Sequence, residues 1–224
     1  MADAYMSLDF LRIEGKTIAP PFLVRYESEM TKTGFETVVY KIENGAEQLL
    51  FAIGLRDGRV TEIRPTWQYR EDGSVVENVE IKYDTPTPQG PGDLITHNDI
   101  EAESCLAGSY LQTWLHDADD GSVSLLTRRI REGKRLPDAE VETRPCYVVA
   151  WDSPNFPPDD YWMRQIYYFD QKTFFLRKWD TLVSEEGKPL KLQRSRIITK
   201  IETEPKKGRR RGKTLDELVK RRRH

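Results

Sequence analysis

The sequence contains few of the residues on which metal and redox chemistry depend. Its 224 residues include two cysteines and three histidines. Cys105 and Cys146 are too far apart for a CxxC site, and His97 and His116 lack the i, i+4 spacing of a zinc-binding helix. We therefore expect no metal site and no cofactor. The sequence leaves open whether the cysteines form a disulfide, and two packed thiols are the simpler interpretation.

Motifs for nucleotide binding and for nucleophilic catalysis are also missing, because the chain has no GxxxxGK[ST], GxGxxG or GxSxG sequence. Ser104 and Ser109 have no base near them in the sequence. The acidic residues Asp117, Asp119 and Asp120 lack the spacing and the final Glu of a calcium loop, so we interpret them as a solvent-exposed turn. We expect that the protein is not an enzyme, while a hydrolase or isomerase with a site assembled from distant residues stays open.

Long hydrophobic stretches are absent as well. No run approaches the ~18 apolar residues that a membrane-spanning helix needs. Residues 1–10 contain Asp3 and Asp9 and do not have the basic and apolar regions of a signal peptide. We expect either a cytoplasmic protein, or a periplasmic or envelope-associated protein whose presequence is missing from this chain.

Aromatic residues and alternating patterns are what the sequence does have. Ten Tyr, eight Phe and five Trp supply apolar area for a core, and alternation of apolar and polar residues favours β-strands. The dipeptides Asn44-Gly45, Asp57-Gly58 and Asp72-Gly73 are typical of hairpin turns, and the Pro- and Gly-rich residues 85–93 predict an extended connection. Strands are predicted over 22–30, 35–42, 49–55, 60–69, 75–83, 123–130, 139–151, 161–170, 173–183 and 190–201.

One segment has a helical pattern instead. Apolar residues recur at three- and four-residue steps over 100–115, which predicts an amphipathic helix. We therefore predict an α+β fold, mainly antiparallel β, in which a curved sheet or incomplete barrel wraps around this one central helix. We expect a single β-rich domain over residues 1–204.

Aromatic residues are dense towards the end of this domain. Alternate residues of a strand point to the same face, so these aromatics have two interpretations. Core packing is the simpler one, and a concave, aromatic-lined surface for an apolar ligand is the other. The candidate ligand-binding residues are Trp114, Tyr161, Trp162, Tyr167, Phe169, Phe175 and Trp179.

The charge of the chain is divided unevenly. Its net charge is −2, whereas residues from Lys206 onward carry ten basic and two acidic side chains. We expect residues 205–224 to form a disordered basic tail with a short amphipathic stretch, in which Thr214 and Glu217 fit a capping box. The tail either only solubilises the protein or binds a polyanion such as nucleic acid, or an acidic partner. The candidate polyanion-binding residues are Lys206, Lys207, Arg209, Arg210, Arg211, Arg221, Arg222 and Arg223.

A family resemblance begins at residues 144–149, RPCYVV, and continues through 167–173, YYFDQKT, and 176–180, LRKWD. These segments resemble the C-terminal half of LolA/LolB-like lipoprotein-sorting factors and their planctomycete relatives. The resemblance implies a strand, an Asp-x-x-Thr turn made by Asp170 and Thr173, and a returning strand that carries Arg177. It also implies an incomplete β-barrel that binds lipid or acyl chains.

The leading hypothesis is therefore a non-enzymatic binding module, associated with the cell envelope, that carries an apolar or lipid-like ligand on a concave sheet. The alternative is a cytoplasmic accessory protein that binds nucleic acid or another polyanion through its basic C-terminal tail. The sequence does not identify the ligand or the oligomeric state.

Overall fold

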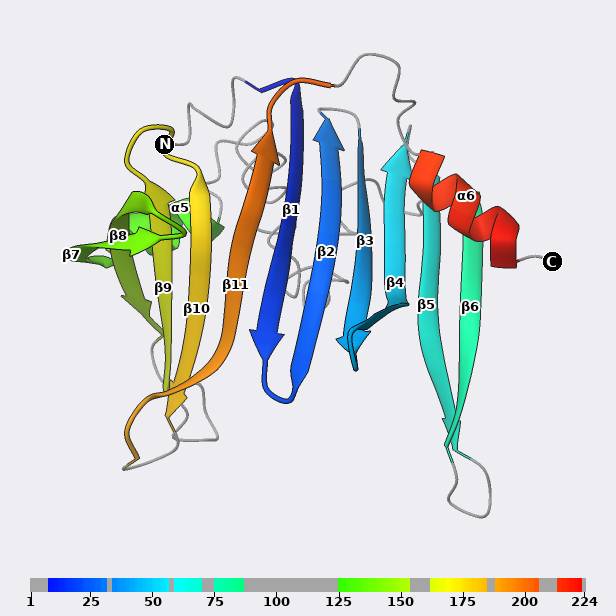
Figure 1. Cartoon of the computed structure of the whole chain (residues 1–224), viewed down its shortest axis with the longest axis horizontal. Coiled ribbons are helices and arrows are strands. Elements are labelled where there is room, and N and C mark those ends of the chain that lie inside the picture. The colour runs from blue at the N-terminus through cyan, green and yellow to red at the C-terminus, as the bar shows by residue number, and fades with distance from the viewer. Residues whose placement is uncertain are drawn as a thin grey trace.

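The computed structural model describes residues 8–31, 34–56, 59–69, 75–86, 125–153, 162–184, 188–205 and 213–222. These residues form eleven strands and two helices (Figure 1). The strands are β1 (Phe10–Ala19), β2 (Phe22–Thr31), β3 (Gly34–Glu43), β4 (Ala46–Arg56), β5 (Arg59–Tyr69), β6 (Val75–Pro86), β7 (Lys134–Val141), β8 (Arg144–Asp152), β9 (Trp162–Asp170), β10 (Leu176–Ser184) and β11 (Lys191–Glu202). The helices are α5 (Leu125–Glu132) and α6 (Lys213–Arg222).

All eleven strands belong to one antiparallel sheet in the order β6-β5-β4-β3-β2-β1-β11-β10-β9-β8-β7. Strands that pair in the sheet also follow one another in the chain, with one exception. At the centre of the sheet, β1 pairs with β11. Residues 87–124 connect β6, at one edge, to α5 and β7, at the other edge. The sheet is therefore two meanders joined through β1 and β11.

The prediction of a mainly antiparallel fold is confirmed, and the first five predicted strands correspond to β2–β6. The turn at Asn44-Gly45 is confirmed too, because both residues have the positive φ angles that such a hairpin needs. The predicted helix over 100–115 lies outside the described residues. A central helix is thus an expectation that the structure does not confirm.

Two predictions in the second meander are wrong. Residues 123–130 were expected to form a strand, but 125–132 form helix α5, whose Ile130 packs against the sheet. Residues 139–151 were expected to form one strand, but they belong to β7 and β8, which are joined by a turn at Glu142 and Thr143. Both turn residues have positive φ, a conformation that neither residue type signals in a sequence.

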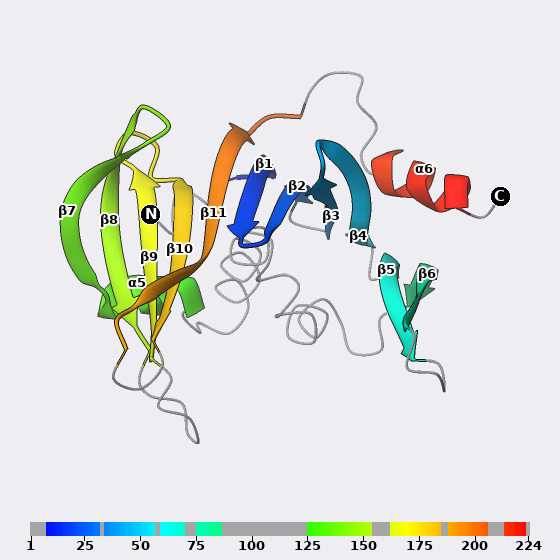
Figure 2. The same cartoon turned by 60° about the horizontal axis from the view of Figure 1, so that its bottom comes forward.

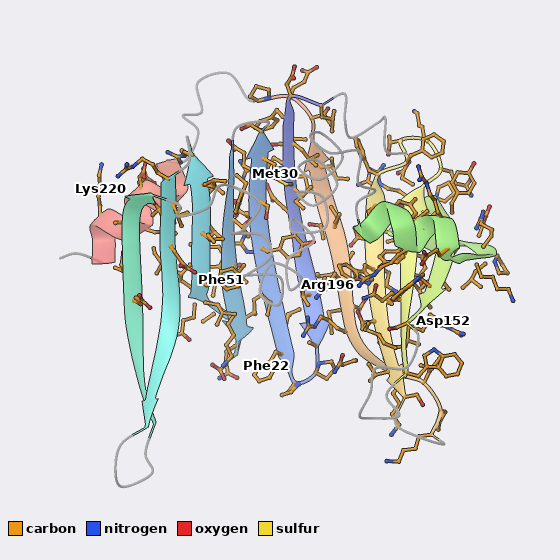
Figure 3. The ribbon with its side chains drawn as sticks, turned by 180° about the vertical axis from the view of Figure 1, so that it is seen from behind. Phe22, Met30, Phe51, Asp152, Arg196 and Lys220 are labelled. Carbon is orange, nitrogen blue, oxygen red and sulfur yellow. The ribbon has the colours of Figure 1, made fainter. Side chains whose placement is uncertain are left out.

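The two faces of the sheet carry different helices. The side chain of Ile130 packs on the face that also holds Tyr26 and Trp179, which we name the α5 face. Leu215 and Val219 of α6 pack on the opposite face, which we name the α6 face. Figure 1 shows α6 in front of the sheet and Figure 3, drawn from behind, shows α5 in front. In Figure 2 the sheet is bent around the side that carries α5.

Part of the predicted tail is ordered against the sheet. Helix α6 begins at Lys213, and its Leu215 and Val219 are buried against Val38, Ala52 and Ile63. This differs from the expected disorder of residues 205–224, and its physical reason is the apolar side of the short amphipathic stretch. The domain boundary at residue 204 stays a prediction.

Candidate ligand-binding face

Most of the buried apolar residues of the sheet lie on the α5 face and form one continuous cluster. Strand register places the cluster across β1, β2, β3, β9, β10 and β11, because its members are paired with one another from strand to strand. Figure 3 shows this face, with Met30 and Phe51 labelled. The buried members are Leu11, Ile13, Tyr26, Met30, Val39, Tyr167, Phe169, Leu176, Trp179 and Ile198.

Aromatic rings occupy the β9–β10 part of the cluster. Tyr167 and Trp179 are cross-strand partners whose ring centroids lie 5.5 Å apart, and the rings of Tyr167 and Phe169 lie 6.4 Å apart. Phe175 is half-buried and packs against the same cluster. Contacts of this kind stabilise a core and also form the walls of apolar binding sites.

Polar groups are embedded in this apolar face at a few points. The guanidinium of Arg196 lies 4.3 Å from the centroid of the Trp179 ring, and Arg196 is 2% exposed. The indole Nε1 of Trp179 is buried without a hydrogen-bond acceptor among the described residues. Ser28 and Thr37 share a buried hydrogen bond of 2.9 Å between their hydroxyls. The α5 face is therefore an apolar surface with a few buried polar groups, among them the indole N–H of Trp179.

Helix α5 contacts the sheet mainly at β8. The Arg129 side chain donates to Oε1 of Gln165 at 2.8 Å, and its guanidinium lies 4.7 Å from the centroid of a Trp151 ring. The Tyr167 hydroxyl donates to the same Gln165 oxygen. These contacts tie α5 to the β8–β9 side of the face.

The structure brings together four of the seven predicted ligand-binding residues. Tyr167, Phe169, Phe175 and Trp179 belong to the α5-face cluster. Trp162 is 45% exposed and pairs with Ser184, on the opposite face from these four. The remaining two, Trp114 and Tyr161, lie outside the described residues. Ligand binding by this set stays a prediction.

Half of the apolar face was not predicted from the sequence. Tyr26, Met30 and Val39 extend the face into the first meander. Alternation over 22–30 already separated Tyr26 and Met30 from their charged neighbours, and this was the signal that could have found those two. The candidates were instead chosen by aromatic density, which favours the second meander.

The α6 face carries ion pairs in its middle part. Arg12 pairs with Glu27 at 2.9 Å, and Lys200 pairs with Glu14 at 2.7 Å. Lys178 pairs with Asp180 at 2.8 Å. Arg12 and Asp180 are buried, whereas their partners Glu27 and Lys178 are partly exposed. Among the described residues, no group of three His, Cys, Asp or Glu side chains is placed to hold a metal ion.

The turn named by the family resemblance is present. Oδ1 of Asp170 accepts from the backbone N–H of Lys172 at 3.0 Å and of Thr173 at 2.9 Å. Arg177, on the returning strand β10, donates from Nε to Oδ2 of Asp170 at 3.3 Å. The carboxylate therefore closes the turn and ties it to the next strand, which is a structural role.

The free thiol of Cys146 is buried on β8. Burial, followed by the charge of Asp170, raises the pKa of this thiol above its ordinary value. A thiol of raised pKa is a packed side chain and a poor nucleophile. Cys105 lies outside the described residues.

The predicted polyanion-binding residues contribute little to the described structure. Arg221 and Arg222 end helix α6, and their side chains are not described. The other six, Lys206, Lys207, Arg209, Arg210, Arg211 and Arg223, lie outside the described residues. Polyanion binding thus stays a prediction. None of the described helices is long and apolar enough to cross a membrane.

No protein-family model matches the sequence, and no curated protein matches it at a significant level. The fold is similar to that of several solved structures, of which three are described here. Lipoprotein LppX of Mycobacterium tuberculosis has a TM-score of 0.44 and 7% identity, with 91% of each chain covered. LprF from Mycobacterium bovis has a TM-score of 0.41 and 10% identity, with 93% of this chain and 92% of that chain covered.

A LolA superfamily protein from Nitrosomonas europaea has a TM-score of 0.25 and 10% identity, with 90% of this chain and 88% of that chain covered. These likenesses concern the fold alone. The solved structures to which the chain is similar thus include a member of the LolA-like family that its residues 144–180 resemble.

Proposed function

We propose that this protein is a non-enzymatic binding protein that holds an apolar or lipid-like ligand against the α5 face. The observation that carries the proposal is the continuity of the apolar cluster across six neighbouring strands. Several of its outer members are only half-buried, including Val24, Phe35 and Phe51. Half-buried apolar side chains next to a buried aromatic cluster are the usual lining of an apolar site.

The polar groups of the α5 face favour a ligand that has a polar group as well as an apolar part. The buried Nε1 of Trp179 has no acceptor among the described residues. An unmet buried N–H costs the folded protein free energy. A ligand oxygen would recover this free energy once the neighbouring side chains move apart and admit it. We therefore expect a ligand with a long apolar part and at least one hydrogen-bond acceptor.

An environment-sensitive apolar probe tests the proposal. The fluorescence of such a probe should rise when it binds the protein, and Phe51→Gln should weaken its binding by about tenfold, because a half-buried apolar wall becomes polar. Leu49→Gln is the matched control, since Leu49 lies on the same strand, is also half-buried and packs on the α6 face. Equal probe binding by both variants would contradict the proposal.

A second measurement addresses the ligand itself. Native mass spectrometry of the purified wild-type protein should show an added mass that organic extraction removes. Trp179→Phe keeps most of the ring packing and removes the N–H donor, so it should retain probe binding and lose selectivity for ligands that carry an acceptor. Unchanged selectivity in this variant would show that the Trp179 N–H does not contact the ligand.

A further inference from the structure

Four of the five exposed large apolar residues of the described chain are gathered at one end of the sheet. Ile18 and Phe22 flank the β1–β2 hairpin, Leu192 lies at the start of β11, and Trp162 is the first residue of β9. Strand register places all four at the same end, because Ile18 pairs with Ser195 and Trp162 with Ser184. This end is at the bottom of Figure 1 and Phe22 is labelled there in Figure 3. We name these four residues the apolar tip.

The tip residues are unusually exposed for their type. Ile18 is 39% exposed, Trp162 45%, Phe22 54% and Leu192 56%, and only one other large hydrophobic residue of the described chain, Phe174, is comparably exposed. Isolated exposed apolar residues need no explanation, whereas several gathered in one place mark an interaction surface.

Half-buried apolar residues extend the tip across neighbouring strands. Leu23 is the partner of Ile18 and Ile42 is the partner of Leu23, while Leu182 is the partner of Leu192. All of these lie on the α6 face, so an apolar band runs over β3, β2, β1, β11 and β10. The ion pair of Arg164 with Asp152 borders this band, because Arg164 is the partner of Leu182 on β9.

Phe22 identifies the kind of partner. It pairs with Ala19 on the α5 face, whereas Ile18, Trp162 and Leu192 lie on the α6 face. A second protein that covers one face would leave Phe22 in water. A lipid membrane surrounds an inserted sheet end from both sides and therefore covers all four residues.

Aromatic residues next to lysines are typical of protein segments at the membrane–water interface. At the tip, Nζ of Lys41 lies 5.7 Å from the centroid of the Phe22 ring, and the exposed Lys191 precedes Leu192. We propose that the apolar tip docks the protein on a lipid membrane. The proposal uses other residues than the ligand-binding face and holds whether or not that face binds a lipid.

Flotation with vesicles of zwitterionic phosphatidylcholine tests the proposal with the full chain. The wild type should float with the vesicles, and raising the salt about tenfold should change binding little, because the contact is apolar. The triple variant Phe22→Gln, Trp162→Gln and Leu192→Gln should bind at least about tenfold more weakly. Phe174→Gln is the control, since Phe174 is 41% exposed and lies at the opposite end, beside the Asp170 turn.

Other outcomes identify other partners. Wild-type binding that requires anionic lipid and disappears with salt would assign binding to basic residues and overturn the proposal. A wild-type dimer in sedimentation analysis that the triple variant loses, without any flotation, would make the tip an interface between copies. Circular dichroism should show that the triple variant is folded, and it should keep the probe binding of the α5 face.

A second readout keeps the test informative if the triple variant fails to fold. Brominated phosphatidylcholine should quench part of the tryptophan emission of the vesicle-bound wild type, because Trp162 is exposed at the tip. The single substitution Trp162→Phe should retain flotation and lose that quenched part. Equal fractional quenching in both proteins would place Trp162 outside the membrane and overturn the proposal.

Discussion

The two faces of the sheet differ most clearly within strand β2. Tyr26 and Met30 are fully buried on the α5 face, whereas Arg25 and Glu27, next to Tyr26 in the chain, form an ion pair of 2.6 Å on the α6 face. Neighbouring residues of a strand point to opposite sides, so one segment supplies both an apolar surface and a hydrated one. The effect of a substitution in β2 therefore depends on which face of the sheet the residue occupies.

The largest expected effect is that of Trp179→Ala on the α5 face. Trp179 is 2% exposed, and its ring packs against Tyr167 and Arg196. We expect a loss of about 3–5 kcal/mol in the free energy of unfolding, because the substitution leaves a cavity in the core. Urea unfolding followed by circular dichroism measures it.

Lys178→Ala is the control for this prediction, because Lys178 is the preceding residue and points to the α6 face. Its ion partner Asp180 is buried and also accepts from the Tyr168 hydroxyl at 3.0 Å. We expect a loss of about 1–2 kcal/mol. Equal losses for Trp179→Ala and Lys178→Ala would mean that the two faces do not differ in their contribution to stability.

The next largest effect is expected at the buried Asp170. Asp170→Asn removes a charge that faces the buried Arg177 and should lower the free energy of unfolding by about 2–4 kcal/mol. Asp152→Asn is the control, because the pair of Asp152 with Arg164, at 2.7 Å, is exposed. It should cost less than about 1 kcal/mol. A similar cost for both substitutions would show that burial does not set the strength of these pairs.

The pKa of Asp170 predicts how the stability of the protein changes in acid. Burial alone raises the pKa of Asp170, but backbone hydrogen bonds from Thr173 and Lys172 and the charge of Arg177 outweigh it, so that the pKa lies below its ordinary value. A lowered pKa stabilises the folded state above the ordinary Asp value of about 3.9, and this stabilisation is lost as the pH falls further. Stability of Asp170→Asn should therefore fall less between pH 5 and pH 2 than that of the wild type.

A smaller and more local effect is expected where α6 meets the sheet. A Cβ at Gly54 would lie 2.7 Å from Cδ2 of Leu215, so Gly54→Val should displace α6 from β4. We expect faster amide exchange over 213–222 and a loss of about 1–2 kcal/mol in the free energy of unfolding. Leu215→Ala weakens the same contact from the helix side and should give the same local pattern. Unchanged exchange over 213–222 in both variants would show that this contact does not hold the helix.

Much of the first meander was predictable, because its strands alternate regularly and the Asn44-Gly45 turn carries a strong signal. Strand β1 was not predicted. Its Gly15 interrupts the pattern, and the reason is visible only in three dimensions. A Cβ at Gly15 would lie 2.3 Å from the Tyr26 hydroxyl and 2.5 Å from the carbonyl oxygen of Ile197. Glycine is required at this position because the Tyr26 side chain of β2 and the backbone of β11, which is distant in sequence, leave no room for a Cβ.

The second meander shows a different limit. The β7–β8 turn uses positive φ angles at Glu142 and Thr143, residue types that do not signal a turn, and so two strands were predicted as one. Phe174 also has positive φ, which delays β10 beyond its predicted start. The aromatic candidates Tyr167, Phe169 and Trp179 were predicted by density alone, and strand pairing then determined that Trp162 faces away from them.

The smallest expected effect is that of Glu47→Gln, which tests an exposed ion pair of the α6 face. Arg25 donates from Nε and from its terminal nitrogen to the two carboxylate oxygens of Glu47, at 2.6 and 2.8 Å, in an exposed pair. The hydrogen bond from Arg25 lowers the pKa of Glu47, so any stabilisation is present above the ordinary Glu value of about 4.3 and is lost as the pH falls below it.

We expect Glu47→Gln to cost less than about 1 kcal/mol at neutral pH, and less still at high salt, because water and ions screen an exposed pair. Thermal unfolding at two salt concentrations measures it, with Glu43→Gln, in the exposed pair with Lys41 at 3.1 Å, as the control. A cost close to that of Trp179→Ala would mean that ion pairs hold the sheet as firmly as the apolar cluster does. The α6 face would then be a second structural core, and the α5 face would no longer be distinguished by its packing.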